Sequence, residues 1–431
     1  MALKPLVKTT LALTALAAAS AAFAQTSNPD QALINALIQK GVLTKEDAAQ
    51  ITADVAKANK GYDVLTNPAD GMIKKLTLSG RFQAQYEGLG TSIDGAVNPV
   101  STERFLLRRI YLGARVDLVG NYYGVLTYDF ANSSFDAAYV GWKQSDLLSI
   151  DAGLKKAPFG YEELTSSGAL KAIERSPLTR YIDEPNNGRR LGASSYRIGL
   201  FASGADGILF YNVALTNPDR NEYSGDGTSG PVINAQPAVQ TAASTAADNT
   251  FAYYGTVGLS DKFQGGTYKV GLEYGYVPDQ GGPGAVIGQG NNITLAGAYA
   301  DVTYGDFNLQ AEYESAKDDN GVSATQSATP KGYWVQPSYF VIPKVLEGVV
   351  RYSSINSDHR GVALSDGIRG APSGGSMNSM TELYVGGNWY LAGNDAKLSI
   401  GYIHGESKDK PLGGTAKATT DGVRSQMQVN F

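Results

Sequence analysis

Apolar and polar residues alternate with a period of two along most of the chain from Leu76 onward. The segment 76–87 carries Leu, Phe, Ala and Tyr on one face and Thr, Ser, Arg, Gln and Glu on the other, and 307–314 and 425–431 repeat this pattern. Such alternation predicts β-strands with one apolar and one polar face. A soluble β-sandwich also alternates, so a single strand does not separate a sandwich from a membrane barrel.

The alternating segments predict sixteen strands. They lie at 76–87, 103–118, 121–131, 135–144, 147–157, 190–203, 206–217, 250–260, 266–278, 291–304, 306–318, 330–341, 345–356, 378–391, 395–408 and 423–431.

The lengths of the connections follow the parity of the strands. Connections after even-numbered strands are tight, as at Val119-Gly120, Gly204-Ala205 and Gly305, whereas those after odd-numbered strands are mostly long. The long ones are 88–102, 158–189, 218–249, 279–290, 319–329, 357–377 and 409–422, and the short connection near 132–134 is the exception. Short turns at one rim, long loops at the other and an even number of strands are typical of an outer-membrane barrel, whose closure pairs every backbone amide. We therefore predict an all-β fold, a transmembrane 16-stranded antiparallel β-barrel over 76–431.

Aromatic residues near the strand ends agree with two interfacial girdles. They are Tyr122, Tyr128, Phe130, Trp142, Tyr253, Tyr276, Tyr304, Trp389 and Tyr390. The chain ends on an apolar face with Phe431, as many outer-membrane barrels do.

The first 24 residues predict a cleaved export signal, with basic Lys4 and Lys8, a short apolar stretch and a small-x-small site at Ala22-Phe23-Ala24. Residues 25–75 are predicted to form a short N-terminal periplasmic extension, helical and coiled-coil-like, with Gly41 ending its first helix. A flexible tether is the alternative for this segment, because so small an apolar face makes a lone helical hairpin marginal.

Composition narrows the function. The chain has no Cys, which excludes disulfides and thiol chemistry, and we expect no cofactor. Without Lys4 and Lys8 the basic residues number 34 (36 minus 2) against 41 acidic, a net charge of −7. This balance argues against nucleic acid as a partner. The expected partners are small solutes and the lipid of the bacterial outer membrane.

Basic residues predict the chemistry of the lumen. The long loop 158–189 is the candidate for narrowing the pore, and the polar phase of the strands points further cations inward. The candidate pore-lining or anion-binding residues are Arg81, Arg108, Arg109, Arg115, Lys155, Lys171, Arg175 and Arg180. Rings of Arg or Lys select anions, and the planar guanidinium suits phosphate and carboxylate oxygens. The alternative is that these bases only neutralise lumenal acids such as Asp117, Asp129, Asp151, Glu273 and Glu312.

Arg108 is out of phase, because the apolar alternation of its strand places it on the lipid side. It must snorkel at the rim, face a subunit interface, or sit at a bulge that turns it inward. The sequence leaves all three open.

Several motifs resemble the phosphate-selective porin O and P family. They are Phe105-Leu-Leu-Arg-Arg-Ile-Tyr-Leu-Gly-Ala-Arg-Val-Asp117, Tyr128-Asp-Phe130, Ala138-Tyr-Val-Gly141, Lys156-Ala-Pro-Phe-Gly-Tyr-Glu-Glu-Leu-Thr-Ser-Ser167, Ile173-Glu-Arg175 and Gly188-Arg-Arg-Leu-Gly192. The resemblance implies a homotrimer of 16-stranded barrels with lumenal arginines and a folded-in third loop, in which Arg108-Arg109 and Glu174-Arg175 supply anion contacts. Members can carry Lys after Thr-Ser-Ser, where this chain has Gly168, with Lys171 three residues on.

Four functions compete at this stage. The first is passive diffusion of small solutes with a preference for anions, such as phosphate; here substitution of Arg175 or Arg109 should lower anion selectivity. A general or sugar-type porin is the second, although most tyrosines fall on the lipid phase. An enzyme would depend on His359 or His404, and we expect none. A structural or adhesive barrel is suggested by the long loops 218–249 and 357–377.

Overall fold

The computed structural model describes residues 62–66, 71–95, 99–185, 189–218, 251–278, 292–323 and 325–431. The predicted signal peptide at 1–24 lies outside these residues, and so does most of the predicted extension at 25–75. Of that extension, only the short strand β1 (Tyr62–Thr66) and the residues from 71 onward are described, and β2 already begins at Ile73. The barrel lies in one compact unit, Asp63–Asn430.

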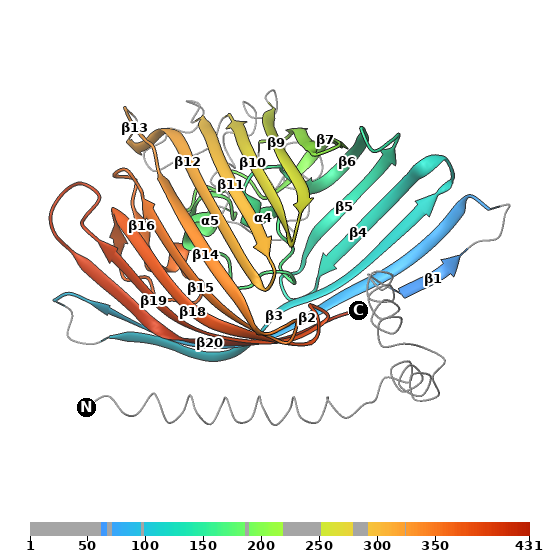
Figure 1. Ribbon diagram of the computed structural model, residues 1–431. Coiled ribbons are helices and arrows are strands. Elements are labelled where there is room, and N and C mark those ends of the chain that lie inside the picture. Colours follow the sequence, from blue (N-terminus) through green and yellow to red (C-terminus); the bar gives the residue numbers. More distant parts are fainter. Residues whose placement is uncertain are drawn as a thin grey trace, which may run out of the picture. The chain divides into compact units, whose positions relative to one another are not determined.

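Sixteen antiparallel strands close into a barrel (Figure 1). In chain order they are β2 (Ile73–Ile93), β3 (Val100–Leu118), β4 (Tyr122–Asp129), β5 (Ser134–Lys143), β6 (Ser149–Lys156), β7 (Tyr196–Asp206), β8 (Leu209–Thr216), β9 (Ala252–Phe263), β10 (Gly266–Val277), β11 (Ile293–Tyr304), β12 (Phe307–Ser323), β14 (Lys331–Ile342), β15 (Leu346–Asn356), β18 (Ser379–Ala392), β19 (Ala396–Lys408) and β20 (Lys417–Asn430). Each pairs with its neighbour in the chain, and β20 returns to β2 from Arg81↔Asn430 to Ile93↔Ala418. The predicted all-β fold with a closed 16-stranded antiparallel barrel is confirmed.

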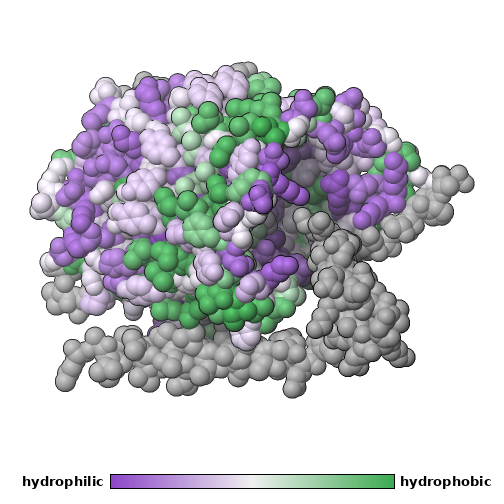
Figure 2. All heavy atoms as spheres, in the orientation of Figure 1, coloured by the Kyte–Doolittle hydropathy of each residue, from purple (hydrophilic) through white to green (hydrophobic). Residues whose placement is uncertain are grey.

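The burial pattern is inside out compared with a soluble protein. On β10, Leu272 and Tyr274 are 65% and 54% exposed on the outer face, whereas Glu273 between them is buried. Figure 2 shows hydrophobic residues gathered over the middle of the outer face that is drawn. Exposing apolar side chains to hydrocarbon carries no free-energy penalty. Charged side chains point into the lumen, where water and other polar groups solvate them. None of the helices in the described part of the chain has the length and hydropathy to span a membrane.

One predicted turn is wrong by a few residues. The turn after β7 lies at Gly207-Ile208 instead of Gly204-Ala205, because Gly207 adopts a φ of 57°, which a two-residue hairpin turn requires. The strand prediction at 190–203 also starts too early, because 190–195 belong to the preceding loop and β7 begins at Tyr196.

Arg108 sits at a β-bulge. The register between β2 and β3 passes from Gln83↔Arg109 to Ala84↔Leu107, which leaves Arg108 as the extra residue. The bulge turns its side chain into the lumen beside that of Arg109, and both are buried. Of the three alternatives for Arg108, the inward bulge is confirmed.

Three predicted aromatic girdle residues, Tyr122, Tyr304 and Trp389, are well exposed on the outer face. Tyr390 is an exception to the prediction, because its hydroxyl donates to Glu347 in the lumen. The neighbouring Trp389 takes the outward position, as alternation along β18 demands.

Candidate functional site

Residues 157–185 and 189–195, which we call the constriction loop, fold into the barrel and pack against one side of its wall. The loop contains α4 (Tyr161–Leu164) and α5 (Pro177–Ile182), both drawn within the ring of strands in Figure 1. Its apolar residues Phe159, Leu178 and Tyr181 are fully buried, and α5 lies against β12, β14, β15 and β18. The loop therefore has a core of its own and is not a flexible flap.

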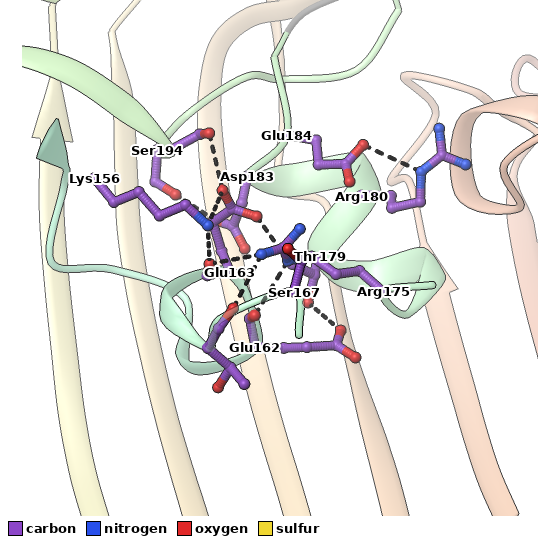
Figure 3. A network of polar contacts seen from close by, with 12 residues as sticks. Lys156, Glu162, Glu163, Ser167, Arg175, Thr179, Arg180, Asp183, Glu184 and Ser194 are labelled. Atoms are coloured by element: carbon purple, nitrogen blue, oxygen red, sulfur yellow. Dashed lines mark hydrogen bonds and ion pairs between the residues drawn. The ribbon is translucent and has the colours of Figure 1, made fainter. Parts of the chain in front are cut away.

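Arg175 lies in the middle of the constriction loop (Figure 3). Its Nε is 2.9 Å from a carboxylate oxygen of Glu163, and its guanidinium donates to the carbonyl oxygens of Glu162, Glu163 and Thr165. Glu162 in turn accepts from the backbone amide of Ser176, the N-cap of α5. Arg175 is 6% exposed, so its guanidinium stabilises the conformation of the loop.

The wall holds the loop through Arg351 on β15. This arginine is 1% exposed and bridges Glu382 of β18, at 2.8 Å, and Glu162 of the loop, at 3.0 Å. It also donates to the carbonyl oxygen of Glu174. Further round the wall, Lys171 pairs with Glu347 on β15, and Lys397 donates to the carbonyl of Leu170.

A second segment folds inward and locks onto the constriction loop. Residues 357–378, the second inward loop, contain β16 (Val362–Ala363), α7 (Leu364–Gly367) and β17 (Ser376–Met377). Val362, Ala363 and Leu364 are fully buried, and α7 packs against α5. The long connection predicted at 357–377 thus folds into the barrel, because its few apolar residues suffice to dock it there. The adhesive function loses this support, and of the other loop only Pro218 at its start lies among the described residues.

Charge pairs join the two loops to the bulge. Glu174 lies between Arg108, at 2.6 Å, and Arg369 of the second inward loop, at 3.1 Å. Glu184 accepts from the same Arg369, at 2.7 Å, and from Arg180, at 3.2 Å. Burial alone would raise the pKa of both carboxyls, but the surrounding guanidiniums hold the pKa of Glu174 and of Glu184 well below the ordinary value.

Most of the predicted site residues therefore meet a carboxylate. Besides Arg108, Lys171, Arg175 and Arg180, the pairs are Arg115 with Asp117 at 2.8 Å and Lys155 with Asp151. Arg81 and Arg109 are different, since among the described residues no carboxylate lies within ion-pair distance of either. Arg109 is 3% exposed and donates to the side-chain oxygen of Gln83.

Arg81 is held by neutral groups at the edge of the constriction loop. Its guanidinium donates to the hydroxyls of Ser167, at 2.6 Å, and Ser166, at 3.0 Å, and its Nε donates to Asn430 at 2.9 Å. The side chain is only partly buried. It presents a fixed positive charge to the water beside the loop.

Gly168 makes room for this guanidinium. A Cβ at position 168 would come within 2.7 Å of an Arg81 terminal nitrogen and 2.8 Å of its central carbon. The backbone of Gly168 has no positive φ, so the glycine serves space and not backbone conformation. In this chain the wall residue Arg81 thus occupies the place of a side chain at 168.

Several lumen-facing side chains of the constriction loop and of the wall from β3 to β10 remain accessible to water. On the loop, Leu164, Ser166 and Ala169 are exposed although most of their neighbours are buried. On the wall, the water-accessible cations include Arg115, 45% exposed, and Lys155, 33% exposed. Arg81, Arg115 and Lys155 are thus accessible to water, whereas Arg175 and Arg180 are buried.

Sequence reasoning missed several lumenal cations and rings. Lys269 falls in the polar phase of its strand, so the alternation could have found it. Arg369 and Arg351 become important only through contacts with the loop, which no local pattern signals. Six tyrosines also make lumenal contacts, although most tyrosines were assigned to the lipid phase: Tyr111, Tyr123, Tyr139, Tyr161, Tyr196 and Tyr299.

Neither histidine lies in the passage. His404 is 44% exposed on the outer face of β19, where its Nδ1 is 2.7 Å from Asp421. His359 in the second inward loop is exposed and contacts the carbonyl of Pro411.

Comparison with known proteins agrees with this geometry. Solved structures with the same fold include the outer membrane channel DcaP of Acinetobacter baumannii (13% identity, 85% of this chain and 100% of that chain covered, TM-score 0.54). An anion-selective porin from Comamonas acidovorans is also similar (12% identity, 81% and 99% covered, TM-score 0.52). No curated protein sequence matches the chain.

The family assignment comes from the sequence of the barrel. The family model described as phosphate-selective porin O and P matches residues 76–431, which is nearly the whole chain. The chain forms a water-filled channel for passive diffusion in the bacterial outer membrane, and it belongs to the phosphate-selective porin O and P family.

Proposed function

We propose that the channel prefers small anions and that Arg81 is the main selectivity charge. The observation that carries this proposal is the guanidinium of Arg81, which donates only to the neutral groups of Ser166, Ser167 and Asn430 and lies 5.5 Å from the ring centroid of Tyr111. A charge without a counterion keeps its field, whereas a paired charge loses most of its own at ionic distances. Lys155 and Arg115 add weaker attraction because each is paired with an aspartate.

The predicted roles of Arg108, Lys171, Arg175 and Arg180 change with this proposal. Each of these side chains forms an ion pair with a glutamate and is mostly buried. This supports a structural role, in which they hold the two inward loops in place. The predicted effect of Arg175→Ala on selectivity would then arise through a displaced loop. Arg109, buried but without a carboxylate, adds to the positive field from behind Gln83.

The test is the reversal potential of single channels in a KCl gradient. Arg81→Gln should lower the ratio of chloride to potassium permeability about threefold, the size expected for removing one charge roughly 5–8 Å from an ion in water. Lys143→Gln is the control, because Lys143 is equally cationic but pairs with Asp146 in a turn outside the constriction. Cation preference of the unmodified channel would overturn the proposal, and so would an Arg81 variant with unchanged selectivity.

Phosphate is one anion of this class, and the name of the family supports it. We expect millimolar phosphate to compete with chloride current through the open channel, and Arg81→Gln to weaken that competition. A sugar-type channel is the second candidate, and the tyrosines of the passage favour it. Block of chloride current by maltodextrin and not by phosphate would decide for the second candidate.

We also infer a homotrimer. Strands β4, β6 and β8 have 8 residues each, short for a tilted membrane strand, which needs about 9–11. The adjoining outer face carries the exposed side chains of Phe105, Leu112 and Leu126. Contact with other copies of the chain would cover this low side of the wall. Cross-linking in detergent should give a three-chain species, and a monomer under all conditions would contradict it.

A further inference from the structure

The wall of the passage carries rings beside most of its accessible cations. The Arg115 guanidinium lies 4.4 Å from the ring centroid of Tyr123, and the Lys155 ammonium lies 5.3 Å from Tyr139 and 5.7 Å from Phe201. These residues come from β3 to β7, so the alternation of charge and ring crosses neighbouring strands. We call the two groups described here and in the next paragraph the cation–aromatic band.

The second group centres on Lys269 of β10. Its ammonium lies 5.0 Å from Phe210, 5.8 Å from Tyr161 and 5.9 Å from Tyr299. Within the described residues no carboxylate forms an ion pair with Lys269, and its side chain is exposed. Asp301 and Glu273 are near enough to act on its charge, but neither forms an ion pair with it, so the exposed ammonium can meet an anion that arrives from water.

Three rings of the band lie flat on the wall. A Cβ built on the glycine beneath each ring would come within 2.4 Å of Tyr123, 2.4 Å of Phe210 and 2.5 Å of Tyr299. The glycines are Gly141, Gly258 and Gly271 of the adjacent strands. Phe210 is only half-buried, so part of this ring stays open to the passage as a stacking platform. Tyr299 is 7% exposed and is covered by Tyr161.

The rings are also fixed in place. The hydroxyl of Tyr123 donates to Asp151, and that of Tyr161 donates to Asp301. Tyr161 and Tyr299 stack on each other with centroids 4.5 Å apart and an angle of 17° between their planes. A ligand that stacks on such rings does not have to immobilise them, which favours binding.

We propose that the cation–aromatic band is a binding site for small carboxylates that carry a flat ring. The carboxylate meets Lys269 or Lys155, while the ring lies against Phe210 or Tyr139. Inorganic phosphate uses the cations alone, since it has no apolar face. This inference rests on the proposed preference for anions and adds the class of organic anion that the passage retains.

Benzoate, cyclohexanecarboxylate and benzamide separate the parts of this site. Benzoate has the charge and the flat ring, cyclohexanecarboxylate has the charge and a puckered ring, and benzamide has the flat ring without the charge. Each is added to a single channel carrying chloride current, and the concentration for half-block is measured. We expect benzoate to block at a concentration about three- to tenfold lower than either of the others, the range for one added ring contact or cation.

Wall variants assign the block to the band. Phe210→Leu and Lys269→Gln should each raise the half-block concentration of benzoate about threefold or more. Tyr274→Leu is the matched control, because it removes a ring from the lipid-facing side of the same strand, β10, and should leave the block unchanged.

The outcomes are distinct. Equal block by benzoate and cyclohexanecarboxylate would overturn the role of the rings, and equal block by benzoate and benzamide would overturn that of the cations. In either case a normal anion preference in KCl would leave the proposed function standing. A cation-preferring channel would remove both proposals.

Discussion

The two faces of the constriction loop use the same residue types in opposite ways. On the face toward β12 to β20, arginines meet glutamates in water-poor surroundings, as Arg351 meets Glu162 and Glu382. On the face toward the passage, Arg81 meets hydroxyls and an amide, and Lys269 meets rings. A buried charge needs a countercharge to offset its lost hydration, whereas a charge beside water does not. Only the second kind remains available to a permeating ion.

The largest effect should come from breaking the packed face. In Arg351→Ala two buried carboxylates lose their cation, which costs about 3–5 kcal/mol for a pair of this kind. We expect the loop to leave its place, with larger conductance and rapid protease cleavage near residue 164. Lys143→Gln, in an exposed turn, serves as the control. A variant with unchanged conductance and protease resistance would contradict the role assigned to Arg351.

A smaller effect is expected between the two inward loops. Glu174→Gln removes the charge that Arg108 and Arg369 share and should destabilise the contact by about 1–3 kcal/mol. The change should show as faster gating of single channels, with the barrel still folded in detergent. Ordinary gating in this variant would show that the two loops are held elsewhere.

Acid should act on the same contact in the unmodified channel. The folded-state pKa of Glu174 lies well below its ordinary value of 4.5, so its stabilising contribution is complete above that pH. It is lost as the pH falls through the lowered folded-state pKa. Gating noise should therefore rise in strong acid, and Glu174→Gln should remove this part of the pH dependence. Noise that rises equally in the variant would assign the effect to other carboxyls.

Gly168→Ala sharpens the comparison without unpairing any buried charge. The added methyl would meet the Arg81 guanidinium, which is the far end of a flexible side chain and can move aside. We expect unchanged stability and a loss of anion selectivity of about twofold, less than for Arg81→Gln. The reversal potential in KCl measures this, and a selectivity equal to that of the unmodified channel would show that Arg81 does not need its present place.

The smallest effect is expected at Arg115. This side chain is exposed and paired with Asp117, so Arg115→Gln should change stability and selectivity by less than about 1 kcal/mol. Together with Arg81→Gln it forms a matched pair of lumenal arginines with and without a counterion. A larger change in selectivity for Arg115→Gln than for Arg81→Gln would contradict the proposal that the arginine without a counterion controls selectivity.

The sequence by itself determined the barrel, and close to the residue in most strands. Alternation with a period of two needs only the chemistry of successive side chains, and loops sorted by parity need only their lengths. The same local information placed Arg81, Arg109, Arg115 and Lys155 in the lumen.

Tertiary structure alone decided which of these charges remain active. The inward docking of 357–378, the bulge at Arg108 and the space at Gly168 depend on contacts between residues far apart in the chain. Whether a cation meets Glu174, the hydroxyl of Ser167 or the ring of Phe210 is set by this folding of loops onto the wall. A sequence pattern predicts which face of a strand a side chain lies on, but it does not predict which residue that side chain contacts.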